Sequence, residues 1–262
     1  MMTFDFLLPD RETKPRETGI TMVLDKGLGY EYAKDLMEIS GNYVDLMKFG
    51  WGTAIIQNKN IISKKIKMYQ SYDIIPYTGG TLFEIAYIND KIEELLKETK
   101  ELGFTAIEIS DGSTDMKREE KLDFISIAKE EGFYVLSEVG KKDLEEDNKV
   151  DLKSRIQYIK EELKVGSDKV IIEARESGKG IGIFDNDGNA KTDEIDQIIQ
   201  KIDNNNLIWE APNKNQQVYF VKKLGTNVNL GNISTNDIIS IETIRRGLRG
   251  DTIDLLKRFN KS

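Results

Sequence analysis

Eight short apolar segments recur along the chain, and each runs into polar or charged residues at its end. A stretch with helical character separates nearly every neighbouring pair. Strands that alternate with helices predict a parallel sheet covered by helices, and eight such units predict a single (β/α)8 TIM barrel. The chain has 262 residues, close to the roughly 250 that one such barrel takes. The expected strands are residues 19–25, 44–49, 74–78, 105–110, 133–138, 169–175, 206–210 and 227–230.

Between these strands, apolar residues recur at helical spacing and glycine marks several ends. Helices are expected over residues 30–39, 89–102, 117–131, 152–165, 193–202, 215–224 and 238–246. Gly103 and Gly166, for example, directly follow two of these segments, where glycine commonly ends a helix. No linker or change in composition divides the chain. We therefore expect one domain over residues 1–262, with residues 1–18 as an N-terminal arm or a cover over the barrel bottom.

The chain contains neither histidine nor cysteine. It therefore cannot use a Ser-His-Asp triad, a Cys-His pair, a disulfide framework or a thiolate metal site. Proton transfer must fall to Lys, Asp, Glu or Tyr. A metal ion would need oxygen ligands, which favours Mg²⁺ or Mn²⁺.

Charge and hydropathy argue against two classes of partner. The formal net charge is −8 with acidic and basic residues mixed, which disfavours a nucleic-acid surface. No apolar run approaches the roughly 20 residues of a membrane span, and the first residues lack the apolar core of a signal peptide. We therefore expect a cytoplasmic protein that binds neither nucleic acid nor a membrane.

Charged residues gather at the ends of the predicted strands: Asp25, Lys48, Glu108, Glu138, Glu173, Arg175 and Glu210. In a TIM barrel the active site lies at the carboxyl ends of the strands. Because side chains alternate along a strand, each charge shares a face with a small or aliphatic residue that lies deeper, as Glu108 does with Ala106. Like charges crowded at one mouth repel each other unless a cation relieves them. This pattern indicates an enzyme with a charged pocket; the alternative is a set of ion pairs that stiffen the rim.

Two segments have the composition of anion-binding loops, because glycine lets backbone N–H groups approach an anion and arginine binds phosphate through paired hydrogen bonds. One spans residues 175–180, and the other comprises residues 231–234 with 245–251. The candidate substrate ligands are Arg175, Ser177, Gly178, Lys179, Asn232, Arg245, Arg246 and Arg249. The alternative is a C-terminal helix whose arginines pair with surface acids. The charged residues 141–150 predict a mobile loop over the site, or else a solvated spacer.

Long charged segments punctuated by glycine stand at the strand ends. They are LDKGLG (24–29), KFGWGT (48–53), GGTLFE (79–84), EISDGS (108–113), SEVGKK (137–142), RESGKG (175–180), EAPNKNQQV (210–218) and RRGLRGD (245–251). Over almost the whole chain these segments closely resemble the phosphosulfolactate synthase family. Two departures, Ala174 and Gly231, change no charge. The resemblance implies a Mg²⁺-dependent TIM barrel that adds sulfite to phosphoenolpyruvate. The product is (2R)-phospho-3-sulfolactate, formed in a lyase-type reaction that makes a C–S bond in one route to coenzyme M.

That reaction suggests roles for the charged residues. Sulfite attack on C3 places negative charge on C2 and the carboxylate, which Mg²⁺ can stabilise. The expected metal ligands are Glu108, Asp111, Glu138, Glu173 and Glu210. We expect Lys141 to protonate C2, because Gly140 can turn the chain back over the mouth and leave Lys142 toward solvent. Lys48 and Lys26 would attract the two anionic substrates, and the arginines would hold phosphate.

Three alternatives remain open at this point. A Schiff-base aldolase could use Lys48 or Lys141 as nucleophile, although its usual lysine on the sixth strand is Arg175 here. A different enolpyruvyl or phosphoryl enzyme would not depend on sulfite. A differently specific or non-catalytic homologue, including a stress-related protein, would keep the barrel. Barrels of this kind commonly associate, so a homo-oligomer is expected.

Overall fold

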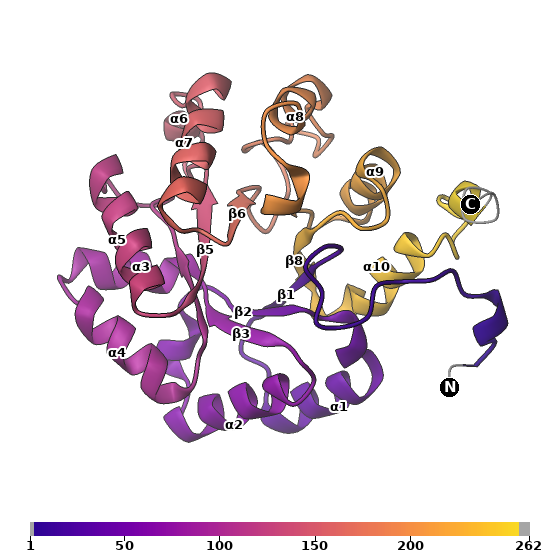
Figure 1. Cartoon of the computed structure of the whole chain (residues 1–262), viewed down its shortest axis with the longest axis horizontal. Coiled ribbons are helices and arrows are strands. Elements are labelled where there is room, and N and C mark those ends of the chain that lie inside the picture. Colours follow the sequence, from indigo (N-terminus) through magenta and orange to yellow (C-terminus); the bar gives the residue numbers. More distant parts are fainter. Residues whose placement is uncertain (1–2, 257–262) are drawn as a thin grey trace.

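The computed structural model describes residues 3–256 and shows a closed barrel of parallel strands, each paired with its neighbours in sequence (Figure 1). The strands are β1 (Thr21–Asp25), β2 (Leu46–Phe49), β3 (Ile75–Thr78), β4 (Ala106–Ile109), β5 (Tyr134–Val139), β6 (Lys169–Ile172), β7 (Leu207–Glu210) and β8 (Leu230–Ser234). Pairing of β1 with β8 closes the barrel. The predicted (β/α)8 fold is confirmed.

The eighth strand begins where its prediction ends. The sequence predicts residues 227–230, but β8 extends to Ser234. Gly231 and Asn232 have the composition of a turn, yet Gly231 pairs with Glu210 of β7 on one side. On the other side, pairing with β1 passes through an irregularity, and Asn232 there has a φ of 54°. Pairing from both neighbours therefore overrides the local preference for a turn.

Helices surround the barrel (Figure 1). They are α1 (Tyr30–Ser40), α2 (Lys59–Gln70), α3 (Gly80–Ile88), α4 (Ile92–Leu102), α5 (Arg118–Glu130), α6 (Leu144–Asp147), α7 (Leu152–Val165), α8 (Thr192–Ile199), α9 (Lys214–Leu224) and α10 (Ile238–Arg245). α2, α3 and α6 were not predicted from the sequence. Asn89, expected to begin α4, instead ends α3, and the side chain of Asn58 caps α2. Within residues 3–256, no helix combines the length and apolar character needed to cross a membrane.

The apolar core has two layers. Inside the barrel, small and aliphatic side chains from alternate strand positions pack with Tyr77; they include Met22, Leu46, Ala106, Leu136, Ile171 and Ile208. A larger apolar layer lies between the outer faces of the strands and the helices. Because side chains alternate along a strand, a residue two positions after an interior one also faces inward. Lys48 follows Leu46 and Glu108 follows Ala106 in this way, so charge collects at the carboxyl end of the barrel.

The N-terminal segment bonds to loops at the amino ends of the strands. Lys14 Nζ donates to the carbonyl oxygen of Gly41 at 3.1 Å, and Gly19 N donates to that of Asn227 at 2.7 Å. Arg16 pairs with Asp45 at 2.9 Å, just before β2. These contacts lie at the end of the barrel opposite the charged mouth.

Candidate active site

A buried lysine stands at the centre of the charged mouth. Nζ of Lys48 on β2 lies 3.0 Å from Oε1 of Glu108 on β4. It lies 3.7 Å from Oε2 of Glu138 on β5 and 3.7 Å from Oε1 of Glu210 on β7. Burial by itself would lower the pKa of Lys48, but the charges of Glu108 and Glu138 outweigh it and raise that pKa well above the usual value. Lys48 therefore stays protonated, which argues against a Schiff-base nucleophile at this position.

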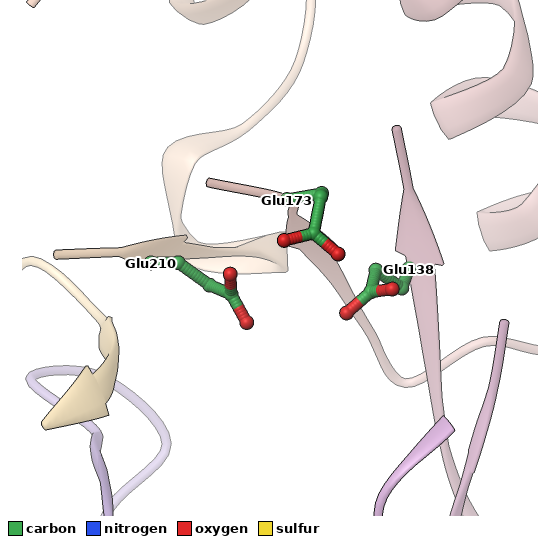
Figure 2. Close-up of side chains that lie close together, drawn as sticks. All are labelled: Glu138, Glu173 and Glu210. Atoms are coloured by element: carbon green, nitrogen blue, oxygen red, sulfur yellow. The ribbon is translucent and has the colours of Figure 1, made fainter. Parts of the chain in front are cut away.

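Three carboxylates converge beside this lysine. Glu138, Glu173 and Glu210 come from the carboxyl ends of β5, β6 and β7, and Figure 2 shows their carboxylates close together. One oxygen atom from each lies within 4.8 Å of the other two. All three residues are buried. A hard divalent cation prefers oxygen donors of this kind, so the set fits Mg²⁺ or Mn²⁺.

The pKa values of the three carboxyls diverge. Burial, together with the charges of Glu138 and Glu210, raises the pKa of Glu173 well above its usual range. Burial also raises the pKa of Glu210 to about 7, although Lys48 opposes it. Burial would raise the pKa of Glu138 as well, but Lys142 and Lys48 lower it to about 2. A bound cation would favour the ionised form of all three carboxyls and so oppose both their burial and their mutual repulsion; such divergence is common at functional sites.

These groups line a cavity of about 240 Å³ at the carboxyl end of the barrel. At its rim, the exposed Lys26 pairs with Glu176 and lies 4.5 Å above the ring of Trp51. Arg175 also lines the cavity, with a positive φ of 58°. Asn232 lines it too, and its Oδ1 atom is buried without a hydrogen-bond partner among the described residues. The structure thus brings many of the predicted residues into one pocket: Lys48, Glu108, Glu138, Glu173, Arg175, Glu210 and Asn232.

The two lysines after β5 point in directions opposite to those predicted. Lys141 Nζ donates to Oδ2 of Asp111 at 2.8 Å and lies outside the cavity. Lys142 lines the cavity, and its Nζ lies 3.3 Å from Oε1 of Glu84 and 3.6 Å from Oε1 of Glu138. The expectation that Lys141 faces the pocket and Lys142 the solvent is therefore wrong. Lys141 is held by Asp111 outside the cavity, and Lys142 faces into it.

Asp111 also lies outside the carboxylate cluster. Its Oδ1 atom pairs with Lys121 at 2.7 Å, and its Oδ2 atom pairs with Lys141. The structure thus corrects the prediction that Asp111 is a metal ligand, because two ammonium groups already neutralise it. Glu108 remains in the pocket, but its Oε1 atom accepts from Gly80 N at 2.7 Å and pairs with Lys48.

Asp25 was grouped with the mouth charges by sequence, but it faces outward from β1. Its Oδ2 atom lies 2.6 Å from Nζ of Lys65 and accepts from the hydroxyl of Tyr69 at 2.8 Å, both on α2. Its Oδ1 atom accepts from the backbone N–H groups of Gly27 and Leu28. Asp25 therefore anchors the loop that carries Lys26 and does not line the pocket.

The C-terminal arginines lie away from the mouth. Arg245 is buried, and its Nη1 atom donates to the carbonyl oxygen of Val228 at 2.6 Å, ahead of β8. Arg246 Nε donates to Oε1 of Glu242 at 2.6 Å, and its Nη1 atom donates to the carbonyl oxygen of Pro9 at 2.8 Å. The prediction that both bind phosphate is wrong, because α10 runs back along the barrel and delivers them to its amino end.

Arg249 packs on the outer surface as well, donating to Oγ of Ser240 at 2.8 Å. It does not line the pocket.

The glycine-rich segment after β6 folds against the start of α9. Asn213 Nδ2 donates to the carbonyl oxygen of Ser177 at 2.8 Å, and Gln216 Nε2 donates to that of Gly178 at 2.7 Å. Gly178 has a φ of +62°, and an added Cβ would lie 2.6 Å from Gln216 Oε1. Lys179 is exposed. These three predicted ligands, Ser177, Gly178 and Lys179, border the mouth without lining the cavity.

With this geometry in place, comparison with known proteins is decisive. The sequence profile of the (2R)-phospho-3-sulfolactate synthase (ComA) family matches residues 9–251. The chain belongs to this family. It is 52% identical over 253 residues to phosphosulfolactate synthase from Methanothermobacter thermautotrophicus, covering 97% of this chain and 98% of that relative. It is 48% identical over 252 residues to phosphosulfolactate synthase from Methanocaldococcus jannaschii, covering 96% and 98%. The resemblance inferred from the strand-end segments is confirmed.

Among solved structures, the chain is similar to 3-hexulose-6-phosphate synthase from Salmonella typhimurium, with a TM-score of 0.58 and 15% identity. The match covers 86% of this chain and 98% of the other. At that identity the likeness shows the fold alone.

One family segment owes its glycines to close packing around the pocket. In GGTLFE (79–84), a Cβ added to Gly80 would lie 2.4 Å from Cβ of Ser110 and 2.7 Å from Oε1 of Glu108. A Cβ added to Gly79 would lie 3.1 Å from Cε of Lys48. The start of α3 can therefore approach the charged cluster only because these positions carry no side chain.

The same segment supplies a site residue that strand-end reasoning missed. Glu84 on α3 is buried, and its Oε1 atom accepts from Oγ of Ser110 at 2.7 Å. The same hydroxyl lies 2.9 Å from Oε1 of Glu138, so Glu84 and Glu138 share the single proton of Ser110 as well as the ammonium group of Lys142. Glu84 lies on a helix, whereas the predicted site residues were charges at or just after strand ends and in the glycine-rich loops. Its place in a segment shared with the family is the signal that could have found it.

Proposed function

We propose that this protein catalyses the Mg²⁺-dependent addition of sulfite to phosphoenolpyruvate, giving (2R)-2-O-phospho-3-sulfolactate. The observation that carries the proposal is the buried pocket that combines a carboxylate trio with two ammonium groups, in a chain of this family. The trio supplies oxygen donors for a cation, and the lysines supply positive charge and protons to an anionic substrate.

In the proposed reaction, the sulfur lone pair of sulfite forms a bond to C3 of phosphoenolpyruvate. The π electrons of the C2–C3 double bond move to C2 and spread into the carboxylate, and C2 then takes a proton. No bond to phosphate breaks. A group that withdraws negative charge from the carboxylate and an acid near C2 are the two requirements.

Glu138, Glu173 and Glu210 would hold the metal ion. When bound, Mg²⁺ would supply charge stabilisation to the substrate carboxylate as it becomes an enediolate. Lys48 pairs with Glu138 and Glu210, and Lys142 pairs with Glu138, but Glu173 has no ion-pair partner among the described residues. The divergent pKa values of the three carboxyls agree with this assignment.

We assign Lys142 as the acid that protonates C2. Burial would lower the pKa of Lys142, but the charges of Glu138 and Glu84 raise it above the usual lysine value. An acid of this kind stays protonated at neutral pH and gives up its proton only to a strongly basic carbon such as that of an enediolate. Lys48 lies deeper and is held by three ion pairs, so we do not assign it as the acid. Its positive charge would hold the substrate anion in place. Lys26 and Arg175 at the rim would attract sulfite and phosphoenolpyruvate.

The test is incubation of the protein with phosphoenolpyruvate, sulfite and Mg²⁺, followed by mass spectrometry of the product and an assay for free phosphate. We expect a sulfite-dependent adduct that retains phosphate. Consumption of phosphoenolpyruvate without sulfite would instead indicate another enolpyruvyl or phosphoryl reaction. Absence of any product with either Mg²⁺ or Mn²⁺ would overturn the proposal.

A further inference from the structure

A second polar cluster lies just outside the pocket, behind the loop that carries Lys142. At its centre is Lys121 of α5, whose side chain is 2% exposed. Lys121 Nζ donates to Oδ1 of Asp111 at 2.7 Å and to the carbonyl oxygen of Glu138 at 2.6 Å. It also pairs with Oε1 of Glu162 on α7 at 2.9 Å. This lysine therefore ties the loop after β4 to the end of β5.

Asp111 continues the chain of contacts to the next loop. Lys141 Nζ donates to Oδ2 of Asp111 at 2.8 Å, to the backbone carbonyl of Asp111 at 2.7 Å and to that of Thr114 at 3.1 Å. One carboxylate is thus held between two ammonium groups from opposite sides. Burial would raise the pKa of Asp111, but Lys121 and Lys141 lower it to about 2, which agrees with a carboxylate that is ionised throughout the neutral range.

The backbone on either side of Lys141 is also fixed. Lys141 N donates to Oδ1 of Asp147 at 3.0 Å, and Lys142 N donates to the carbonyl oxygen of Gly112 at 2.9 Å. A Cβ added to Gly112 would lie 3.2 Å from both Cγ and Cε of Lys142, so that side chain lies directly against the glycine. While the Lys141 side chain is held on one side of the loop, the Lys142 side chain packs along Gly112 and its ammonium group lies near Glu84.

We propose that Asp111 is a positioning residue, which captures Lys141 and thereby aims the Lys142 ammonium into the pocket. The inference rests on the proposed function, in which Lys142 protonates C2. Asp111 itself does not line the pocket. Without its charge, Lys121 and Lys141 would lose their shared partner, and two adjacent lysines would compete for the carboxylates at the mouth.

The principal variant is Asp111→Asn, which removes the charge and keeps the size. We expect kcat to fall about 10- to 100-fold, since misplacement of a reacting group by about 1 Å can cost that much. KM for phosphoenolpyruvate should change little, because the groups that bind it remain. Lys141→Met should behave like Asp111→Asn, whereas Lys141→Arg should keep the ion pair and most of the activity.

A matched control breaks another ion pair on the same pair of helices. Arg118 of α5 pairs with Glu161 of α7 at 3.0 Å and also with Glu162, which holds Lys121; Glu161→Gln removes only the first of these two pairs. Glu161→Gln should leave kcat and KM at their wild-type values. A comparable loss of kcat in this control would overturn the inference, because general loosening of α5 and α7 would then explain the result.

A double variant separates the inference from the proposed function. In a Lys142→Ala background, Asp111→Asn should cause no further loss of kcat, because the group that it positions is already gone. If the wild-type protein is active and Asp111→Asn keeps full kcat, the inference about Asp111 is overturned but the proposed function is not. A wild-type protein that forms no adduct would overturn the proposed function.

Hydrogen exchange provides a readout that does not need turnover. The amide of Lys142 is bonded to Gly112, so its exchange reports on the anchored loop. Asp111→Asn and Lys141→Met should speed exchange across residues 140–143, and Glu161→Gln should not. Unchanged exchange in the first two variants would overturn the inference, whether or not the enzyme is active.

Discussion

Replacement of Lys48 by methionine tests how much one buried ammonium group stabilises the carboxylates at the mouth of the barrel. At an effective dielectric constant of about 20, the Lys48–Glu108 pair at 3.0 Å is worth about 5–6 kcal/mol before desolvation. The pairs with Glu138 and Glu210 at 3.7 Å are each worth about 4–5 kcal/mol on the same basis. Desolvation cancels much of this attraction in the intact cluster. Removing one partner of a buried pair typically costs about 3–5 kcal/mol, because uncompensated charge is left behind.

We therefore expect Lys48→Met to lower the free energy of unfolding by about 3–5 kcal/mol, measured by urea denaturation with EDTA present. Lys65→Met is the matched control. Lys65 is fully buried, and it pairs with Asp25 at 2.6 Å outside the barrel. Both variants should lose stability in EDTA. Added Mg²⁺ should restore more stability to Lys48→Met than to Lys65→Met, because only the former removes a positive charge from beside Glu138 and Glu210.

Two results would contradict this reasoning. A Lys48→Met protein within about 1 kcal/mol of wild type in EDTA would mean that the pocket carboxylates do not need the lysine. Equal recovery of the two variants with Mg²⁺ would mean that the carboxylate trio is not where the ion binds.

The remaining predictions concern the metal, the acid and a corrected arginine. Exhaustive EDTA treatment should abolish adduct formation and Mg²⁺ or Mn²⁺ should restore it; full activity after chelation would remove the metal from the reaction. Lys142→Ala should lower kcat by about 10²–10⁴, the usual worth of a positioned acid, while binding of phosphoenolpyruvate measured by calorimetry persists. Equal activity of Lys142→Ala and wild type would show that Lys142 is not the acid and would make Lys48 the next candidate. Arg246→Ala should lower the free energy of unfolding by about 1–3 kcal/mol, because the hydrogen bonds to Glu242 and Pro9 are lost. KM for phosphoenolpyruvate should be unchanged. A raised KM for phosphoenolpyruvate would instead indicate that Arg246 binds the substrate.

Sequence alone determined the barrel and the inner ring of charges. Strands and helices alternate with periods that can be read directly, and side chains alternate along a strand whatever surrounds it. That local geometry is why Lys48, Glu108, Glu138 and Glu210 were expected together and lie together. Asp25 is the exception. It was expected to face the barrel interior, but Met22 faces inward on β1, so the alternation places Asp25 on the outer face.

Tertiary structure alone decided which lysine after β5 faces the pocket. Gly140 permits the chain to turn either way, and the next two residues are chemically identical. The choice depends on Asp111, which is 30 residues away from Lys141 in sequence and meets it only when the neighbouring loops pack. No periodicity within either loop encodes that contact.

The C-terminal arginines make the same point for helix direction. A pattern of glycine and arginine after the eighth strand suggested a phosphate site, but α10 spans Ile238–Arg245, roughly 12 Å at 1.5 Å per residue. It begins at the mouth and therefore ends near the opposite side of the barrel, where Arg245 and Arg246 meet the N-terminal segment. Composition determines what a side chain can bind, but the path of the backbone between elements decides which groups come within reach of it.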